Sequence, residues 1–145
     1  MYKKILLPTD GSDLSNHAID KAILLAAELG AEIIGLTVTE PFHYVSVDTA
    51  SISDTPESYD ADMQEVAKKR LQRIRIKCDE LDVDCLLIHK ESMHPYEGIV
   101  TTAEETKCDI IFMASHGRRG ISSLLLGSEV NKVLTHTKIP VLVYR

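Results

Sequence analysis

Cysteine is scarce in this sequence, and its spacing excludes two common roles. The three cysteines, Cys78, Cys85 and Cys108, form no C-x-x-C pair and no even set. A disulfide framework needs an even number of cysteines, and most zinc sites need closely spaced ligand pairs. We therefore expect buried, reduced thiols and neither a redox nor a metal-binding role for these residues.

Long apolar runs and an excess of basic residues are also missing. The first apolar run, Ile5 to Leu7, is too short for the core of a signal peptide or for a membrane span, which makes the cytoplasm the expected location. The chain has 16 Lys and Arg against 22 Asp and Glu, a formal net charge of -6. Nucleic acids and anionic membranes attract basic surfaces, so neither is an expected partner.

The motifs of several enzyme classes do not occur either. The sequence has no G-x-x-x-x-G-K-S/T, no early G-x-G-x-x-G and no H-E-x-x-H, which argues against a P-loop NTPase, a dinucleotide-binding Rossmann domain and a zinc protease. Ser115 and His116 are adjacent, but their frame lacks the G-x-S-x-G of a hydrolase elbow. No catalytic residue is therefore assigned.

Strand and helix signals alternate through the whole sequence. The length of 145 residues, with 44% hydrophobic and 26% charged residues, suits one globular domain. Helical spacing from Leu14 to Leu29 is preceded by Ser12 as a cap and followed by Gly30 as a stop. The expected strands are Lys3–Leu7, Ile33–Val38, Cys85–Ile88, Ile110–Met113 and Val141–Tyr144. Further helices are expected from the cap at Thr55 to Leu81, over Pro95–Thr106, and from near Ser128 to before Pro140.

Strands that alternate with helices predict an α/β fold, an open parallel five-stranded sheet of Rossmann-like type with helices on both faces. The stretch from Pro41 to Asp54 fits neither period. We expect a surface loop there, which either covers a site or only fills space.

Two loops are expected to meet at the carboxyl ends of the strands, where ligands bind in open α/β sheets. The first strand leads into Pro8, Thr9 and Asp10, and the fourth leads into His116 and Gly117. If the two strands are neighbours, these loops face each other. Asp10 would then hold Mg²⁺ through water or bind a ribose or adenine, and its alternative role is to cap the following helix.

Gly127 and Ser128 open the last predicted helix, whose unpaired N–H groups and dipole favour a phosphate. Gly117 would let its backbone approach the same anion, and Arg118 and Arg119 would reach it from the loop between them. The alternatives are a glycine that serves only as a cap, a solvated arginine pair and an incidental His116.

Four stretches, taken together, resemble the universal stress protein family over essentially the whole chain. They are "KKILLPTDGS", "CDIIFMASHG", "GRRGISSLLLGS" and "KIPVLVYR", and they occur in the family's order and spacing. The resemblance implies a single universal stress protein domain over residues 1–145.

The ATP-binding branch of that family carries a glycine, two residues, a second glycine, nine residues, and then a glycine followed by serine or threonine. The matching positions here are Ala114, Gly117, Gly127 and Ser128, so the first glycine is replaced. An alanine is tolerated there if its φ is negative. Glu129 is a second departure, because its carboxylate would repel a triphosphate unless it points away or shares a cation.

The resemblance implies that ATP or a related adenine nucleotide binds, and the position of Asp10 at a strand end suits Mg²⁺ as the companion of that nucleotide. Pro8, Thr9 and Asp10 would lie beside the adenosine, Val38 would contact the adenine, and Gly117, Gly127 and Ser128 would hold the phosphates. The full expected set is Pro8, Thr9, Asp10, Val38, Met113, Ala114, His116, Gly117, Arg118, Arg119, Gly127, Ser128 and Glu129. The family also implies a homodimer in which Val141, Leu142, Val143 and Tyr144 pair with their copies.

The function that follows is that of a cytoplasmic stress-response protein whose bound nucleotide regulates its shape or partners, with ATP hydrolysis slow or absent. The alternative is a dimeric interaction protein of the same fold that binds no nucleotide. An ATP pyrophosphatase is disfavoured because the first loop lacks S-G-G-x-D-S.

Overall fold

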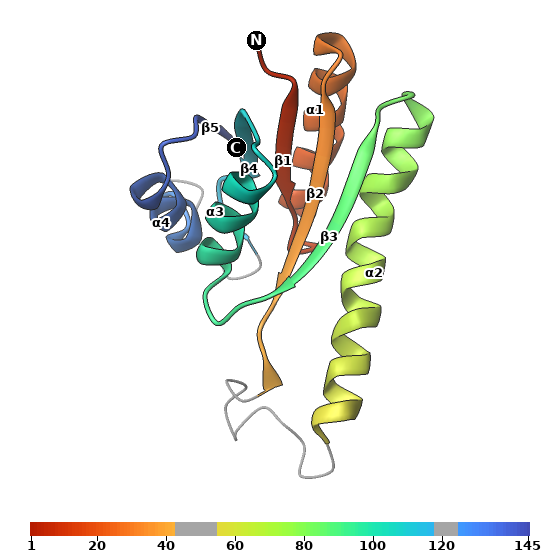
Figure 1. Ribbon diagram of the computed structural model, residues 1–145, viewed down its shortest axis with the longest axis vertical. Helices are drawn as coiled ribbons and strands as arrows, with labels where there is room; N and C mark the ends of the chain where they lie inside the picture. Colours follow the sequence, from red (N-terminus) through yellow and green to blue (C-terminus); the bar gives the residue numbers. More distant parts are fainter. Residues whose placement is uncertain (43–54, 118–124) are drawn as a thin grey trace.

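The computed structural model describes residues 1–42, 55–117 and 125–145, and helices alternate with strands throughout these ranges (Figure 1). The predicted alternation is confirmed. The elements are β1 (Lys4–Pro8), α1 (Asp13–Leu29), β2 (Glu32–Thr39), α2 (Pro56–Glu80), β3 (Cys85–Glu91), α3 (Pro95–Glu105), β4 (Ile110–Ala114), α4 (Ser128–His136) and β5 (Val141–Tyr144).

All five strands are parallel and follow the order β3-β2-β1-β4-β5. The chain winds outward from β1 to β3, then crosses back to β4 on the other side of β1. The winding direction therefore reverses between β1 and β4, where Ile5 pairs with Ile110 and Leu6 with Ile111. The site hypothesis required these two strands to be neighbours, and they are.

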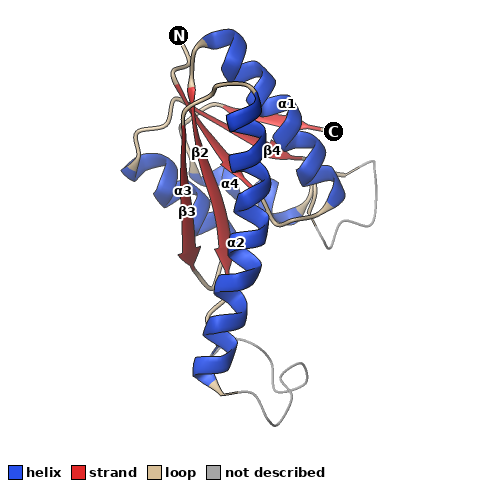
Figure 2. Cartoon of the chain, turned by 90° about the vertical axis from the view of Figure 1, so that its right-hand side faces the viewer, coloured by secondary structure: helices blue, strands red, loops and turns tan. Residues whose placement is uncertain are grey.

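Helices cover both faces of the sheet (Figure 2), with α1 and α2 on one face and α3 and α4 on the other. Residues that alternate along β1 separate the two cores: Ile5 and Leu7 pack towards α1 and α2, and Leu6 packs towards α3 and α4. Burial on both faces explains why the strands read as continuous apolar runs. No helix within the described residues is long and apolar enough to cross a membrane.

The local signals for the first two helices act as expected. Ser12 caps α1 by accepting a hydrogen bond from the Ser15 amide at 3.3 Å, and Gly30 ends the helix with a φ of +63°. Thr55 caps α2 in a reciprocal capping box with Ser58. Such pairs satisfy backbone groups that helix ends leave open.

The strand β3 extends further than its apolar run. β3 continues through His89 and Lys90 to Glu91, because its backbone stays in register with Thr37 to Thr39 of β2. The hydrogen bonds between strands need no apolar side chains, so the apolar run predicted only the first part of the strand.

The predicted loop from Pro41 to Asp54 lies mostly outside the described residues, which include only Pro41, Phe42 and then the chain from Thr55.

Candidate functional site

A cavity of about 460 Å³ lies at the carboxyl ends of β1, β2 and β4. The structure brings together every predicted site residue that it describes, and Arg118 and Arg119 fall outside the described ranges. The predicted residues lining this cavity are Pro8, Thr9, Asp10, Val38, Met113, Ala114, His116, Gly117, Gly127, Ser128 and Glu129.

The turn after β1 is held by its own side chains. Asp10 Oδ1 accepts a hydrogen bond from the Ser12 amide at 2.9 Å, and Thr9 Oγ1 accepts from the Ser15 hydroxyl at 2.8 Å. Gly11 has a φ of +77°, a conformation that residues with a side chain rarely adopt. Asp10 therefore stabilises the entry to α1, the alternative role considered from the sequence, and also lines the cavity.

Gly117 and Gly127 owe their identity to close contacts between turns. A Cβ atom on Gly117 would collide with Asp10 Oδ2. A Cβ atom on Gly127 would lie 3.1 Å from His116 Cα and 3.2 Å from the Ser115 carbonyl oxygen, to which the Gly127 amide donates at 2.7 Å. The three turns at residues 10, 117 and 127 thus converge, and the need for glycine arises in part from the protein's own packing.

Ala114 fits without strain at the position where the motif carries glycine. It is the last residue of β4 and pairs with Tyr144 of β5. Among the described residues other than glycine, only Asp82 and Lys107 have a positive φ. Ala114 therefore has the negative φ that an alanine needs at this position. Its methyl group packs against the core beneath α1 and α2.

Glu129 is engaged by its neighbours on α3 and α4. Its Oε2 accepts a hydrogen bond from the Tyr96 amide at 2.9 Å, and its Oε1 lies 3.5 Å from Lys132 Nζ. The N-cap residue of α3, His94, makes no side-chain capping bond, so Glu129 supplies that cap from α4. These two contacts hold the Glu129 carboxylate, which still lines the cavity, so the repulsion of a phosphate expected from the sequence stays a prediction.

The first turn of α4 supplies positive potential to the cavity. Its N-cap is Gly127, which has no side chain to bond the first amides, and Ser128 opens the helix. Unpaired amides and the helix dipole favour an anion at such an end. His116 lies nearby, with Nδ1 3.2 Å from the Ser115 hydroxyl, which orients the ring.

Several cavity residues escaped the sequence analysis. They are Ser15, Thr39, Glu40, Tyr59, Met63, Arg70, Pro95, Ile99 and Val130. Tyr59 donates from its hydroxyl to the Glu40 carbonyl at 2.9 Å, and burial raises the pKa of this phenol. Arg70 had a detectable signal, because it lies between Ala67 and Leu71 in the buried stripe of α2, where a charge is unusual.

The two sides of the cavity differ in chemistry. Val38, Ile99, Met113 and Val130 form an apolar wall on the side of α3 and α4. Thr9, Ser15 and Arg70 form a polar wall on the side of α1 and α2. A flat apolar group and an attached anion would both find complementary surface here.

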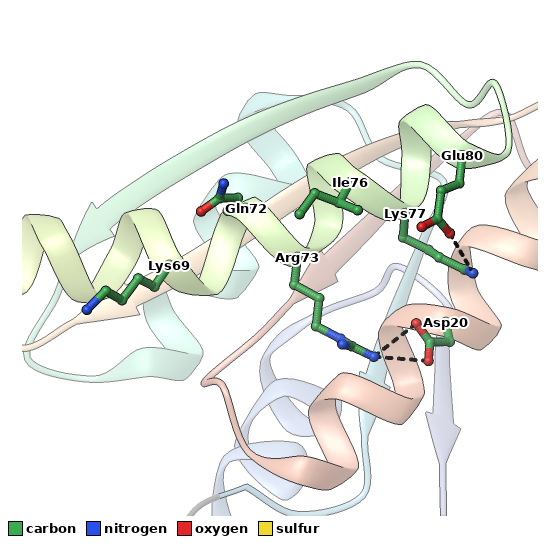
Figure 3. Close-up of a pocket in the computed structure, with 7 residues that line it drawn as sticks. All are labelled: Asp20, Lys69, Gln72, Arg73, Ile76, Lys77 and Glu80. Carbon is green, nitrogen blue, oxygen red and sulfur yellow. Dashed lines mark hydrogen bonds and ion pairs between the residues drawn. The ribbon is translucent and has the colours of Figure 1, made fainter.

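A second groove, of about 410 Å³, lies between α1 and α2, and two ion pairs lie along it (Figure 3). Arg73 pairs with Asp20 at 3.1 Å, and Lys77 pairs with Glu80 at 3.0 Å. The first pair links α2 to α1 and the second lies within α2, and we assign no site to this groove. Within the described residues, no three His, Cys, Asp or Glu side chains are grouped to hold a metal ion.

Comparison with known proteins gives relatives over the full length of the chain. The model of the universal stress protein family matches residues 1–145. A universal stress protein of Methanocaldococcus jannaschii, MJ0531, is 33% identical over 147 residues, covering 100% of this chain and 83% of the relative. The solved structure of protein MJ0577 is 31% identical, with a TM-score of 0.83, and the match covers 99% of this chain and 95% of that one.

Two more distant structures share the fold and contain nucleotides. A universal stress protein in complex with cAMP is 24% identical, with a TM-score of 0.69 and coverage of 99% and 97%. An Arabidopsis thaliana family protein with AMP bound is 18% identical, with a TM-score of 0.65 and coverage of 97% and 90%. Because a family model matches the whole chain and a full-length relative is one-third identical, this chain belongs to the universal stress protein family.

Proposed function

We propose that this protein is a cytoplasmic stress-response protein that binds an adenine nucleotide, with ATP as the preferred form, as a regulatory ligand. The observation that carries the proposal is the convergence of the turns at residues 10, 117 and 127 on one cavity. The cavity lies where the winding of the sheet reverses, which is the usual ligand position in open α/β folds. The cAMP and AMP in two structures of the same fold support an adenine nucleotide.

The two walls suggest how the ligand lies. The adenine packs against Val38 and the rest of the apolar wall, and the ribose lies beside Asp10. The phosphates lie at the first turn of α4, where Gly127, Ser128 and the nearby Gly117 offer main-chain amides. Arg118 and Arg119 remain proposed phosphate contacts.

The residues present fit Mg²⁺ only as a companion of the phosphates. Asp10 is a carboxylate at the cavity, and one of its oxygens already accepts a hydrogen bond from Ser12. Magnesium commonly uses one or two carboxylates together with phosphate oxygens and water. When bound, it would neutralise phosphate charge beside Asp10.

A homodimer through β5 is part of the same proposal. β5 lies at one edge of the sheet, and Val141, Leu142, Val143 and Tyr144 are all half-buried. An apolar edge strand with unpaired backbone groups favours association with another strand. The pairing of β5 with its copy would cover that edge.

Titration calorimetry tests the proposal, with ATP, ADP, AMP, cAMP and adenosine added to the full-length protein in the presence and absence of Mg²⁺. We expect saturable binding of the phosphorylated ligands. Val38→Trp should abolish it by filling the apolar wall, and the matched control Leu86→Trp, on β3 where residue 86 is 53% exposed, should not. An absence of heat at millimolar ligand would instead favour the nucleotide-free interaction protein.

A further inference from the structure

We propose that Thr9 and Ser15 form a buried hydroxyl pair that donates a hydrogen bond to a ribose hydroxyl of the ligand and so determines specificity for the sugar. This inference rests on the proposed nucleotide site and deepens it by naming a contact that recognises the sugar. Ser15 then has a role at a site where the sequence alone did not place it.

Ser15 is a polar residue on an otherwise apolar buried face. It lies in the first turn of α1 and is 4% exposed, whereas serine lies mostly at protein surfaces. The other buried residues of this helix are all alanine or isoleucine, namely Ala18, Ile19, Ala22, Ile23 and Ala26. Because alanine occupies neighbouring buried positions, packing alone does not account for the Ser15 hydroxyl.

The hydrogen bonds of the pair leave one O–H proton over. Ser15 Oγ donates to Thr9 Oγ1 at 2.8 Å, and the Gly11 amide donates to the same oxygen at 3.2 Å. A hydroxyl oxygen accepts two hydrogen bonds and donates one, so Thr9 Oγ1 is filled as an acceptor and keeps its own proton to donate. Within residues 1–42, 55–117 and 125–145, neither hydroxyl makes another hydrogen bond. If the two hydroxyls exchange roles, the spare proton moves to Ser15 and the count is unchanged.

The spare proton lies at the cavity. Thr9 is 6% exposed, and both Thr9 and Ser15 line the cavity. A buried donor without an acceptor costs free energy, so native proteins nearly always supply one. The acceptor for this proton must therefore come from whatever fills the cavity.

The backbone of Thr9 is fixed before a ligand arrives. Its amide donates to the Leu36 carbonyl oxygen at 2.8 Å, and its carbonyl oxygen accepts from the Thr37 hydroxyl at 2.8 Å. A donor that is already held in place loses little freedom on binding, which favours selective recognition.

A sugar hydroxyl suits this place better than an anion does. Asp10 follows Thr9 and also lines the cavity, and an ionised carboxylate can only accept hydrogen bonds. A group bound between the hydroxyl pair and Asp10 therefore has to accept from the pair and donate to the carboxylate. A hydroxyl does both, whereas an ionised phosphate oxygen only accepts. The ribose is the part of a nucleotide that carries hydroxyls.

Calorimetry with sugar analogues tests the contact. ATP, 2′-deoxy-ATP and 3′-deoxy-ATP are titrated into the wild type, Thr9→Val, Thr9→Ser and Ser15→Ala. Valine keeps the shape of threonine without the hydroxyl, and serine restores the hydroxyl. The matched control is Thr102→Val, because Thr102 is 1% exposed and does not line the cavity. Melting temperatures of all five proteins report whether a variant has altered the fold.

We expect Thr9→Val to weaken ATP about 2- to 10-fold, the worth of one hydrogen bond, and to leave unchanged the affinity for the analogue that lacks the recognised hydroxyl. Thr9→Ser and Thr102→Val should match the wild type. Ser15→Ala should cost less than Thr9→Val because Thr9 keeps its proton, and a larger cost would place the spare proton on Ser15.

Two results would overturn the inference. Equal losses for ATP and both analogues would assign the hydroxyl pair a structural role only. An affinity for ATP that neither Thr9→Val nor Ser15→Ala changes would mean that the spare proton meets only water.

A sugar without a base or phosphate distinguishes failure of this inference from failure of the proposed nucleotide site. Methyl β-D-ribofuranoside is titrated into the wild-type protein while the methyl resonance of Thr9 is followed by NMR. A saturable shift in a protein that does not bind ATP would support the hydroxyl pair and reject the nucleotide. If ATP binds and Thr9→Val does not alter its affinity, the inference alone fails. If neither ATP nor the riboside binds, both fail.

Discussion

At the cavity, close contacts with single atoms explain why some positions are glycine. Gly117 is a clear case, because the space that a side chain would need is filled by the Asp10 carboxylate. The sequence analysis attributed this glycine to the approach of a phosphate. The structure adds a reason that operates without any ligand, since a Cβ atom at residue 117 would displace the Asp10 carboxylate from its present position.

Gly117→Ala should therefore destabilise the protein by about 0.5–1.5 kcal/mol, the usual worth of one hydrogen bond, because residue 117 is exposed and the Asp10 carboxylate would move aside at the expense of its bond to the Ser12 amide. The measurement is urea unfolding of the wild type, Gly117→Ala, Asp10→Ala and the double variant. Because Asp10→Ala removes the colliding oxygen, Gly117→Ala should cost much less in that background. A full cost in both backgrounds would mean that another contact requires the glycine.

Cys78 gives a second prediction at the residue scale. Cys78 is fully buried, and burial raises the pKa of its thiol from 9.0 to about 12. Between these values the unfolded chain loses a proton that the folded chain keeps, so the free energy of unfolding should fall as the pH rises. One such proton contributes at most about 1.4 kcal/mol per pH unit.

Chemical unfolding from pH 8 to pH 11 tests this prediction. The wild type should lose stability above pH 9, and Cys78→Ala should lose it less steeply because the variant has no thiol to ionise at that position. If the free energy of unfolding falls equally steeply with pH in both proteins, the Cys78 thiol does not cause the loss of stability. Burial also raises the pKa of Cys108, so a residual slope in the variant is expected.

At the scale of elements, Glu129 links α4 to α3. Glu129→Ala should leave the first turn of α3 without its cap, at a cost of about 0.5–2 kcal/mol, and should speed hydrogen exchange at the Tyr96 amide. Glu129→Gln keeps a carbonyl oxygen at the same place and should largely restore protection. Equal exchange in all three proteins would show that the bond does not hold the helix.

Most elements could be predicted from the sequence because their signals are local. Apolar runs, the Ser12 and Thr55 caps and the Gly30 stop placed the strands and helices to within a few residues. The polar end of β3 was missed because its pairing with β2 depends on backbone register alone. Asp10, Gly117 and Gly127 were expected from the strand ends and the start of the last helix, whereas Val38 was expected only from the family resemblance. The cavity contacts of α2 were missed because they depend on how that helix packs on the sheet.

At the scale of the whole molecule, the proposed dimer depends on the outer edge of β5. The Ser115 amide donates to the Tyr144 carbonyl and the Ile111 amide to the Pro140 carbonyl, so alternation along the strand leaves the Val143 N–H on the open edge. Val143→Pro should remove that donor and leave the bonds to β4 intact. We expect a monomer in sedimentation velocity.

Val143→Thr is the matched control, because it changes the side chain and keeps the N–H group. This variant should remain a dimer. If Val143→Pro also sediments as a dimer while it retains the wild-type melting temperature, the copies do not associate through β5.

The whole account depends on a nucleotide binding at the carboxyl ends of β1, β2 and β4. The most direct measurement is a two-dimensional amide NMR spectrum of the full-length protein during titration with ATP and Mg²⁺. The account predicts saturable shifts concentrated at residues 9–11, 38–40, 113–117 and 127–130. Shifts confined to the opposite edge of the sheet, or no shifts at millimolar ATP, would contradict it.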